Sequence, residues 1–200
     1  MRQLPDRRGQ YDRRKSPRQR RRQAHSRLID ATARVICETD VEAPNVTQII
    51  SLAQVGRNTF YQLFREGKDA RRATERTATR VLADAVDRAV RDAVTPIERL
   101  RALANAWIEL ACCDSALIRL AVLAAPSKGP PLASQVLGRR LQLVADAARD
   151  QGIVAATPPS SRVAMVVAAW HSAAHQAARN QEGARVLASE LVDFTLRAFR

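Results

Sequence analysis

The chain has 200 residues, of which 46% are hydrophobic, and 33 Lys and Arg against 20 Asp and Glu give it a formal net charge of +13. This length suffices for one or two domains with a substantial apolar core, whereas no apolar run reaches the roughly 18 residues that a membrane span requires. Because the Arg-rich N-terminus lacks the apolar stretch of a secretory signal and the cysteines are odd in number, we expect a cytoplasmic protein.

Residues 1–22 form a basic arm with few apolar side chains, so we expect this arm to be disordered in the free protein. Two uses of its charge are open. Arginines can enter a DNA minor groove, as flexible arms do, or they can neutralise phosphates and raise the affinity for any sequence. We assign the second use to residues 2–15. The first is assigned to the arginines next to the first predicted helix: Arg18, Arg20, Arg21 and Arg22.

A helix is predicted over about residues 23–38, because apolar side chains recur there at helical spacing. Its end is loosely defined, since the residues that follow include no glycine stop. The predicted buried face comprises Leu28, Ile29, Thr32, Val35 and Ile36. We expect the nearby Cys37 to be a buried thiol, like Cys112 and Cys113.

Two short helices and a tight turn are predicted next. Asn45 can cap the first helix, whose buried face consists of Val46, Ile49, Ile50 and Ala53. The turn Gln54-Val55-Gly56 leads into the second helix, which directs Phe60, Leu63 and Phe64 inward. We expect Phe60 and Phe64 to be core residues and Tyr61 to lie outside; the alternative is that all three aromatic residues form a core stripe.

The polar residues left outside match the chemistry that a DNA major groove requires. Arg can bind guanine and Asn can bind adenine through paired hydrogen bonds, and Thr, Tyr and Gln reach phosphates or base edges. This pattern is typical of a helix-turn-helix, in which one helix braces on the backbone and the other enters the groove. The predicted DNA-binding residues of these helices are Thr47, Arg57, Asn58, Thr59, Tyr61 and Gln62.

These residues resemble the TetR family of transcriptional repressors. The resemblance covers about 45 residues and rests on Ile29, Ala31 and Ala33, on Ile49, Ala53 and Val55, on Thr59, Phe60, Tyr61 and Phe64, and on Lys68. The family usually has Gly directly after the Ala of the turn and a capping hydroxyl two residues later, where this chain has Gln54 and Gly56. The link from Phe64 to Lys68 is one residue longer than the commonest version. The resemblance implies that Lys68 contacts a DNA phosphate.

An all-α fold of about nine helices follows from the helix-forming composition and from this resemblance. Residues 23–68 would be the helix-turn-helix domain and residues 69–200 a helical domain for effector binding and dimerisation. The predicted helices of the second domain cover about 68–94, 97–113, 115–126, 132–150, 162–179 and 183–199, with loops at 127–131 and 157–161.

The last two predicted helices have wide apolar faces, rich in small residues. The resemblance implies that they pack against their copy as a four-helix bundle, so we expect a homodimer that binds a palindromic operator with half-sites roughly 10 base pairs apart or a small multiple. The alternative is that they only fold the monomer. Their apolar residues are Val163, Val166, Val167, Trp170, Ala173, Ala174 and Ala177, followed by Val186, Leu187, Leu191, Phe194, Leu196 and Ala198.

The resemblance also implies a small-molecule effector that lowers DNA affinity. Candidates for its binding wall are Trp107, Cys112, Leu117, Leu120, Met165, Trp170 and His171. Apolar walls with few polar groups suit a hydrophobic or aromatic effector. The alternative is that both tryptophans are core residues whose indole N–H finds a carbonyl.

No catalytic motif or cofactor site stands out, so we expect no enzyme activity and no cofactor. His171 and His175 share the spacing of a metal-binding pair, but no supporting ligands lie nearby, so no metal site is predicted. Cys112 and Cys113 have apolar neighbours and are expected to be structural. The main functional interpretation is a ligand-responsive repressor. The alternatives are a global or architectural DNA-binding regulator without an effector, and an enzyme or carrier with a vestigial helix-turn-helix.

Overall fold

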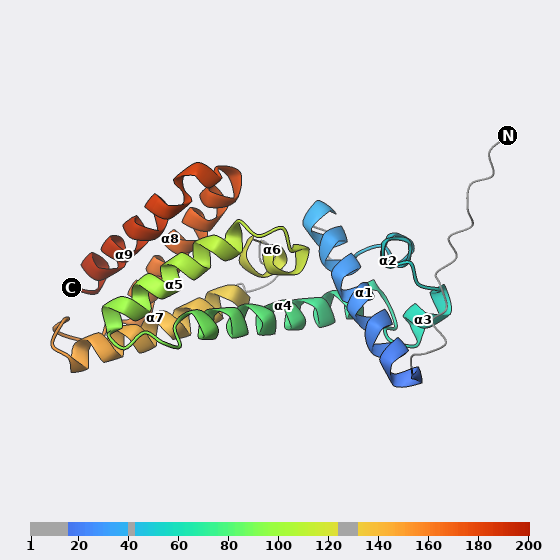
Figure 1. Ribbon diagram of the computed structural model, residues 1–200, viewed down its shortest axis with the longest axis horizontal. Helices are drawn as coiled ribbons and strands as arrows, with labels where there is room; N and C mark the ends of the chain where they lie inside the picture. Colours follow the sequence, from blue (N-terminus) through green and yellow to red (C-terminus); the bar gives the residue numbers. More distant parts are fainter. Residues whose placement is uncertain (1–15, 40–42, 124–131) are drawn as a thin grey trace. The chain divides into compact units, whose positions relative to one another are not determined.

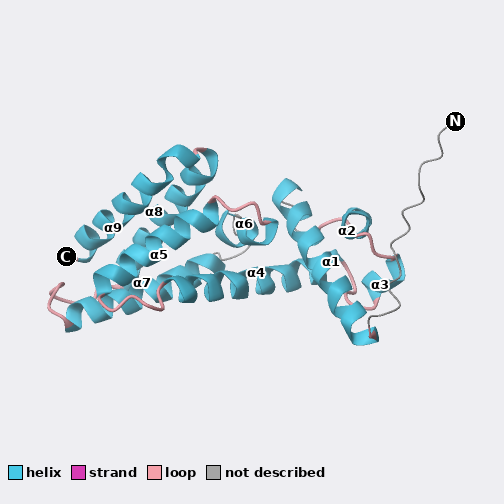
Figure 2. Ribbon diagram, in the orientation of Figure 1, coloured by secondary structure: helices cyan, strands magenta, loops and turns pink. Residues whose placement is uncertain are grey.

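The structure is a computed structural model that describes residues 16–39, 43–123 and 132–200, and these residues form helices joined by loops (Figure 2). Within them lie nine α-helices and one short 3-10 helix, which confirms the predicted all-α fold. The chain divides into two compact units, Met1–Thr74 and Glu75–Arg200. Helix α4 (Gly67–Ala89) crosses this boundary. The predicted loop at 127–131 and residues 1–15 of the basic arm lie outside the described residues.

Helix α1 (Pro17–Thr39) begins about six residues earlier than predicted. The Ser16 hydroxyl accepts from the Gln19 backbone N–H at 3.2 Å, and the Gln19 side chain accepts from the Ser16 N–H at 2.9 Å. This reciprocal pair is a capping box, and Pro17 occupies the first helical position, where its missing N–H costs nothing. The prediction of disorder is therefore wrong for residues 17–22, because a strong local start signal precedes the arginines.

The predicted inner face of α1 is confirmed, since Leu28, Ile29, Thr32, Val35 and Ile36 are all buried. The Thr32 hydroxyl donates to the Leu28 carbonyl at 2.7 Å, so it is buried without an unsatisfied polar group. The prediction of a buried Cys37 is wrong. Cys37 is exposed, because each helical residue turns by about 100° from the one before it, which places the side chain after Ile36 outside the core.

Helices α2 (Val46–Ala53) and α3 (Arg57–Tyr61) follow as predicted. The Asn45 side chain caps α2 by accepting from the Thr47 N–H at 2.8 Å. Phe60 is fully buried and Phe64 is 7% exposed, so both are core residues as expected. Their ring centroids lie 5.6 Å apart in a tilted arrangement. This aromatic pair holds the short α3 in place, because so short a helix is not stable by itself.

The turn between α2 and α3 depends on an unusual backbone conformation at Gln54. Its φ of 52° and ψ of 46° are left-handed, and no other non-glycine residue of the described chain has a positive φ. This conformation suits glycine and costs other residues about 1–2 kcal/mol. Gly56, in contrast, has an ordinary φ of −72°. The strain of the turn is therefore located at Gln54.

We expect Gln54→Gly to stabilise the N-terminal unit by about 0.5–1 kcal/mol. The substitution removes the left-handed strain, and the greater freedom of glycine in the unfolded chain offsets only part of this gain. Urea denaturation measures the change. Gln54→Ala is the matched control, because it removes the same side chain but keeps a Cβ in the strained conformation. Equal stabilisation by both variants would contradict the assignment.

The C-terminal unit contains the rest of α4 and five further α-helices, and Figure 1 shows α5, α7, α8 and α9 packed side by side within it. Thr95 and Glu98 form a capping box at the start of α5, and backbone N–H groups of Thr95 and Val94 lower the pKa of the Glu98 carboxyl. The bounds are α5 (Pro96–Ala111), α6 (Ala116–Leu123), α7 (Leu132–Asp150), α8 (Ser160–Arg179) and α9 (Ala184–Phe199), with a 3-10 helix at Gln181–Gly183.

The core of this unit buries more apolar side chains than the sequence pattern predicted. Trp107 and Trp170 are fully buried, and Leu82 and Val86 of α4 join the same cluster. The α8 residues that were expected to face a second copy are all buried within the protomer: Val163, Val166, Val167, Trp170, Ala173, Ala174 and Ala177. For this face of α8 the prediction is wrong, because α5, α7 and α9 of the same chain pack against α8.

An ion pair also ties α7 to α4 within the C-terminal unit. The Arg140 guanidinium donates to both carboxylate oxygens of Asp87, at 2.6 and 2.7 Å. Such a paired geometry fixes orientation as well as distance. Among the described helices, none combines the length and the apolar character needed to cross a bilayer.

Candidate nucleic-acid interface

The structure brings together predicted DNA-binding residues from both short helices. The Arg57 guanidinium lies 3.4 Å from the Thr47 hydroxyl, so the start of α3 lies beside the start of α2. Arg57, Asn58 and Gln62 are exposed, while Thr59 is half-buried. We call the set Thr47, Arg57, Asn58, Tyr61 and Gln62 the polar ridge. Its members carry a guanidinium, two amides and two hydroxyl groups, the kinds of donors and acceptors that base readout requires. None of the five residues is buried in the core.

Tyr61 shows how the core orients the polar ridge. Its side chain is 52% exposed, in agreement with the prediction that it lies outside the aromatic core. Its ring packs edge-on against Phe60 with centroids 5.4 Å apart. Because Phe60 is fully buried, Tyr61 packs against the core while about half of the residue stays exposed. This ring contact therefore links the polar ridge to the core.

Lys68 is exposed on the first turn of α4. The Asp69 carboxylate accepts from the Arg65 backbone N–H at 3.2 Å, which closes the link between α3 and α4. Gly67 packs so closely against Pro44 that a Cβ would overlap the Pro44 carbonyl oxygen. These two contacts define the position of Lys68 within the N-terminal unit, although the link is one residue longer than in the family pattern.

The predicted arginines of the basic arm lie on α1 instead. Arg21 and Arg22 are exposed, and Arg20 is half-buried. Because these arginines lie within α1, they are held on a helix and do not belong to a flexible segment. Arg18, Arg21 and Arg22 border a hollow that His25 also lines, and His25 was not among the predicted DNA-binding residues.

Both tryptophans are core residues, as the alternative describes, although only the Trp107 indole finds a carbonyl. The Trp107 indole N–H donates to the Trp170 carbonyl at 3.1 Å. The Trp170 indole N–H donates to the Thr195 hydroxyl at 2.9 Å. Thr195 in turn donates to the Leu191 carbonyl. Both rings thus have satisfied polar groups in a filled core.

The other candidate effector-binding residues differ widely in exposure. Leu120 is buried and Leu117 is half-buried on α6. Met165 is 64% exposed, so its inclusion in an enclosed pocket wall of the protomer is wrong. The reason is geometric: Val163, Val166 and Val167 already occupy the inner face of α8, and Met165 falls on the opposite side.

His171 joins three helices through its two ring nitrogens. Nδ1 lies 3.2 Å from the Val122 carbonyl and Nε2 lies 2.9 Å from the Ser134 hydroxyl. A carbonyl only accepts, so Nδ1–H donates to Val122 and Nε2 accepts from Ser134. Burial lowers the pKa of His171, which keeps the imidazole neutral at neutral pH. Ser134 belongs to no sequence motif. Its hydrogen bond to His171 joins residues far apart in the sequence, so the sequence did not predict it.

No group of three metal-ligating side chains occurs among the described residues. His175 is exposed, whereas His171 is hydrogen-bonded to Ser134 and Val122. Cys112 borders a second hollow of about 290 Å³ between α5 and α9, which Glu109 and Arg185 also line. Burial raises the pKa of the Cys112 thiol, as its apolar neighbours indicated, so the thiolate is disfavoured.

The helical architecture is similar to that of solved transcriptional regulators. No family model and no curated protein matches the sequence. Solved structures are similar over most of the chain. The transcriptional regulator FadR from Bacillus subtilis in complex with stearoyl-CoA has a TM-score of 0.72 at 15% identity, covering 88% of this chain and 100% of its own. The TetR-family regulator SCO4454 from Streptomyces coelicolor has a TM-score of 0.68 at 17% identity, covering 89% and 96%.

A third similar structure is AibR in complex with isovaleryl coenzyme A and operator DNA. Its TM-score is 0.65 at 15% identity, covering 86% of this chain and 97% of its own. The three comparisons cover 86–89% of this chain and 96–100% of the solved chains, so the similarity extends over both units. The chain therefore has the fold of the TetR family of transcriptional regulators.

Proposed function

We propose that this protein is a cytoplasmic, sequence-specific DNA-binding transcriptional regulator. The observation that carries the proposal is the polar ridge, in which Arg57 and Asn58 are exposed on α3 and Gln62 is exposed at its C-terminal end, next to the buried Phe60. These side chains supply the donors and acceptors that distinguish base pairs in a major groove. The structural similarity to AibR, which was solved in complex with operator DNA, supports DNA binding by this fold.

The proposed active form is a homodimer that binds a palindromic operator. Exposed apolar side chains remain on the outer surfaces of α8 and α9, namely Met165, Val186 and Phe194. Large exposed apolar residues on neighbouring helices suit a protein interface. A symmetric pair of polar ridges then meets two half-sites related by the same two-fold axis.

We further propose that a small hydrophobic effector releases the repressor from its operator. The effector would prefer the geometry that does not bind DNA, and its differential affinity sets the size of the effect. FadR with stearoyl-CoA and AibR with isovaleryl coenzyme A support an apolar acyl group as the class of effector. Within the C-terminal unit, the candidate contacts are Leu117, Leu120, Cys112 and His171, with Trp107 and Trp170 as the supporting core.

A binding selection from random duplexes tests the proposed function directly. The purified protein should enrich a palindrome with half-sites separated by roughly one helical turn or a small multiple. Enrichment of no sequence would contradict specific regulation. A thermal-shift screen with acyl-CoA thioesters then separates the ligand-responsive repressor from a global regulator without an effector, because a specific ligand raises the melting temperature with concentration.

Substitutions in the polar ridge should alter specificity, whereas Lys68 should affect all sequences alike. We expect Asn58→Ala or Arg57→Ala to weaken binding to the selected operator by about 1–3 kcal/mol and to relax the preference at one position of each half-site. Lys68→Ala should weaken all duplexes equally and reduce the salt dependence. Fluorescence anisotropy with operator duplexes carrying single base changes measures both effects. A uniform loss in Asn58→Ala would argue against base contact.

A further inference from the structure

The N-terminal part of α1 carries a row of basic side chains that the polar ridge does not use. Arg18, Arg21, Arg22 and His25 follow one another at spacings of three and four residues, so they lie on one face of the helix. We call this set the basic stripe. The same helical spacing continues through the buried core residues of α1. The same face of α1 is therefore buried in the core from Leu28 onward and basic near the N-terminus of the helix.

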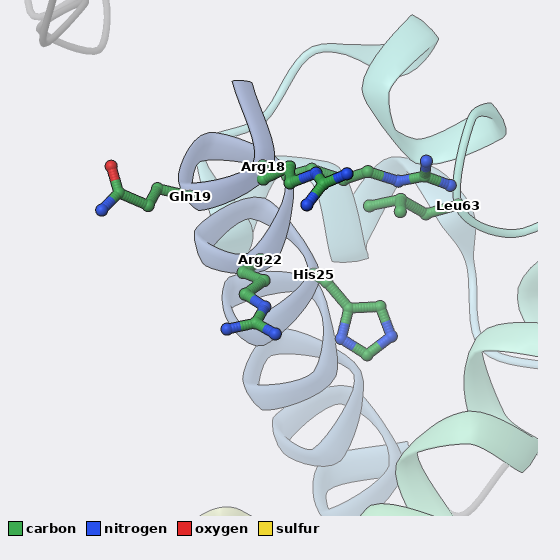
Figure 3. A pocket seen from close by; sticks show the side chains of 6 residues that line it. Arg18, Gln19, Arg22, His25 and Leu63 are labelled. Atoms are coloured by element: carbon green, nitrogen blue, oxygen red, sulfur yellow. The ribbon is translucent and has the colours of Figure 1, made fainter. Parts of the chain in front are cut away.

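The basic stripe borders a hollow of about 700 Å³, which Gln19 and Leu63 also line (Figure 3). The His25 ring lies 5.5 Å from the ring of Phe64, so one end of the stripe is held beside the link between α3 and α4. In Figure 3, Gln19 points away from the side of α1 on which His25 and Leu63 lie. The hollow thus belongs to the N-terminal unit and adjoins the end of α3.

The charge of this hollow has one sign. Three guanidiniums line it together with His25, and none of the described residues that line it is acidic. Described ion pairs include those of Arg34, Arg140 and Arg149, and none of these three belongs to the basic stripe. Like charges that gather on one surface repel one another. Here their arrangement favours an external anion.

We propose that this hollow binds a phosphate group, namely a DNA-backbone phosphate just outside the half-site that the polar ridge contacts. The guanidinium fork matches the geometry of phosphate oxygens and forms paired, charge-assisted hydrogen bonds with them. This inference rests on the proposed function. A free phosphate ester offers the same chemistry and is the other possible source of the group.

The helical structure of this segment decides between the two uses that the sequence left open for these arginines. An α-helix with its side chains is about 10–12 Å wide, whereas the minor groove of B-DNA is about 6 Å wide. A capped helix starting at Pro17 therefore does not enter the groove as a flexible arm would. Contacts to the backbone add affinity and fix register, and they carry no direct base readout.

The test compares two duplexes with the selected operator, one ending at its outermost base pairs and one extended by about one helical turn on each side. The variant is Arg21→Gln combined with Arg22→Gln. On the long duplex, each lost phosphate contact should reduce the magnitude of the slope of log K against log salt by about 0.9. The double variant loses about two such contacts per protomer, so the slope should become shallower by about 1.8 per protomer. On the short duplex it should bind like the unaltered protein, and the preferred sequence should not change.

Arg27→Gln is the matched control, because Arg27 is exposed on α1 but does not line the hollow. It should change neither binding nor slope. Circular dichroism should show unaltered folding for all variants, since the replaced side chains are exposed. An equal loss on both duplexes, an altered base preference, or the same loss in Arg27→Gln would overturn the assignment to a flanking phosphate.

Inorganic pyrophosphate, titrated into the DNA-free protein at constant ionic strength, tests the other source. Binding should shift the ring-proton signals of His25 in an NMR spectrum, and the double variant should abolish the shift. A duplex-length effect supports the backbone phosphate, with or without pyrophosphate binding. Pyrophosphate binding alone reassigns the hollow to a free phosphate ester and overturns the DNA contact. If no operator is found, the proposed function fails and the pyrophosphate titration still decides whether the hollow binds phosphate; no response in either experiment overturns the site.

Discussion

Phe60→Ala is expected to destabilise the N-terminal unit by about 3–5 kcal/mol and to abolish DNA binding. The side chain is fully buried and contacts the rings of both Tyr61 and Phe64, so its removal loses apolar burial and leaves a cavity. Because small units have only about 5–15 kcal/mol of stability, this loss threatens the folded state. Hydrogen exchange at the amides of α1 and α2 measures the change locally.

Two further variants keep this prediction informative if Phe60→Ala does not fold. Phe60→Leu retains most of the apolar volume and should cost less than about 1.5 kcal/mol. Tyr61→Ala removes the adjacent exposed ring; it should cost less stability than Phe60→Ala but still weaken operator binding. If Tyr61→Ala destabilised the unit as much as Phe60→Ala, the division between core and DNA-facing aromatic residues would be incorrect.

Gly67→Ala should destabilise the same unit by about 1–3 kcal/mol, although alanine is the better helix former. The propensity gain is at most about 1 kcal/mol, whereas the new Cβ would overlap the Pro44 carbonyl oxygen. Since that oxygen belongs to the backbone, the chain must move to relieve the overlap, and overpacking of this kind costs about 1–3 kcal/mol. Thermal or urea denaturation measures the net effect.

Gly56→Ser is the control for Gly67→Ala. A Cβ at Gly56 meets no atom closer than the Thr59 hydroxyl at 4.0 Å, and the backbone conformation there suits any residue. The serine hydroxyl can also cap α3, so we expect no loss and a gain of a few tenths of a kcal/mol. A stabilised Gly67→Ala variant would show that α4 does not begin against Pro44.

Local signals in the sequence predicted much of the helical architecture. The core face of α1 and the division between Phe60 and Tyr61 follow from helical spacing, which depends only on neighbours three or four residues away. Capping was equally local, and Thr95 with Glu98 and Asn45 with Thr47 begin helices close to where they were expected. The start of α1 was missed even though Ser16 and Gln19 form the same motif, because the arginine-rich composition favoured disorder.

Contacts distant in sequence were not predictable in this way. Periodicity showed that α8 has an apolar face, but whether that face meets the same chain or a second copy depends on how helices separated by many residues pack. For the same reason only the tertiary structure placed Met165 outside, paired His171 with Ser134, and set Trp107 against the Trp170 carbonyl. The sequence by itself determined the helices and the chemistry of the polar ridge, because both depend on local spacing. The tertiary structure decided which apolar faces are filled and brought Leu63 beside the basic stripe, because burial depends on the whole packed chain.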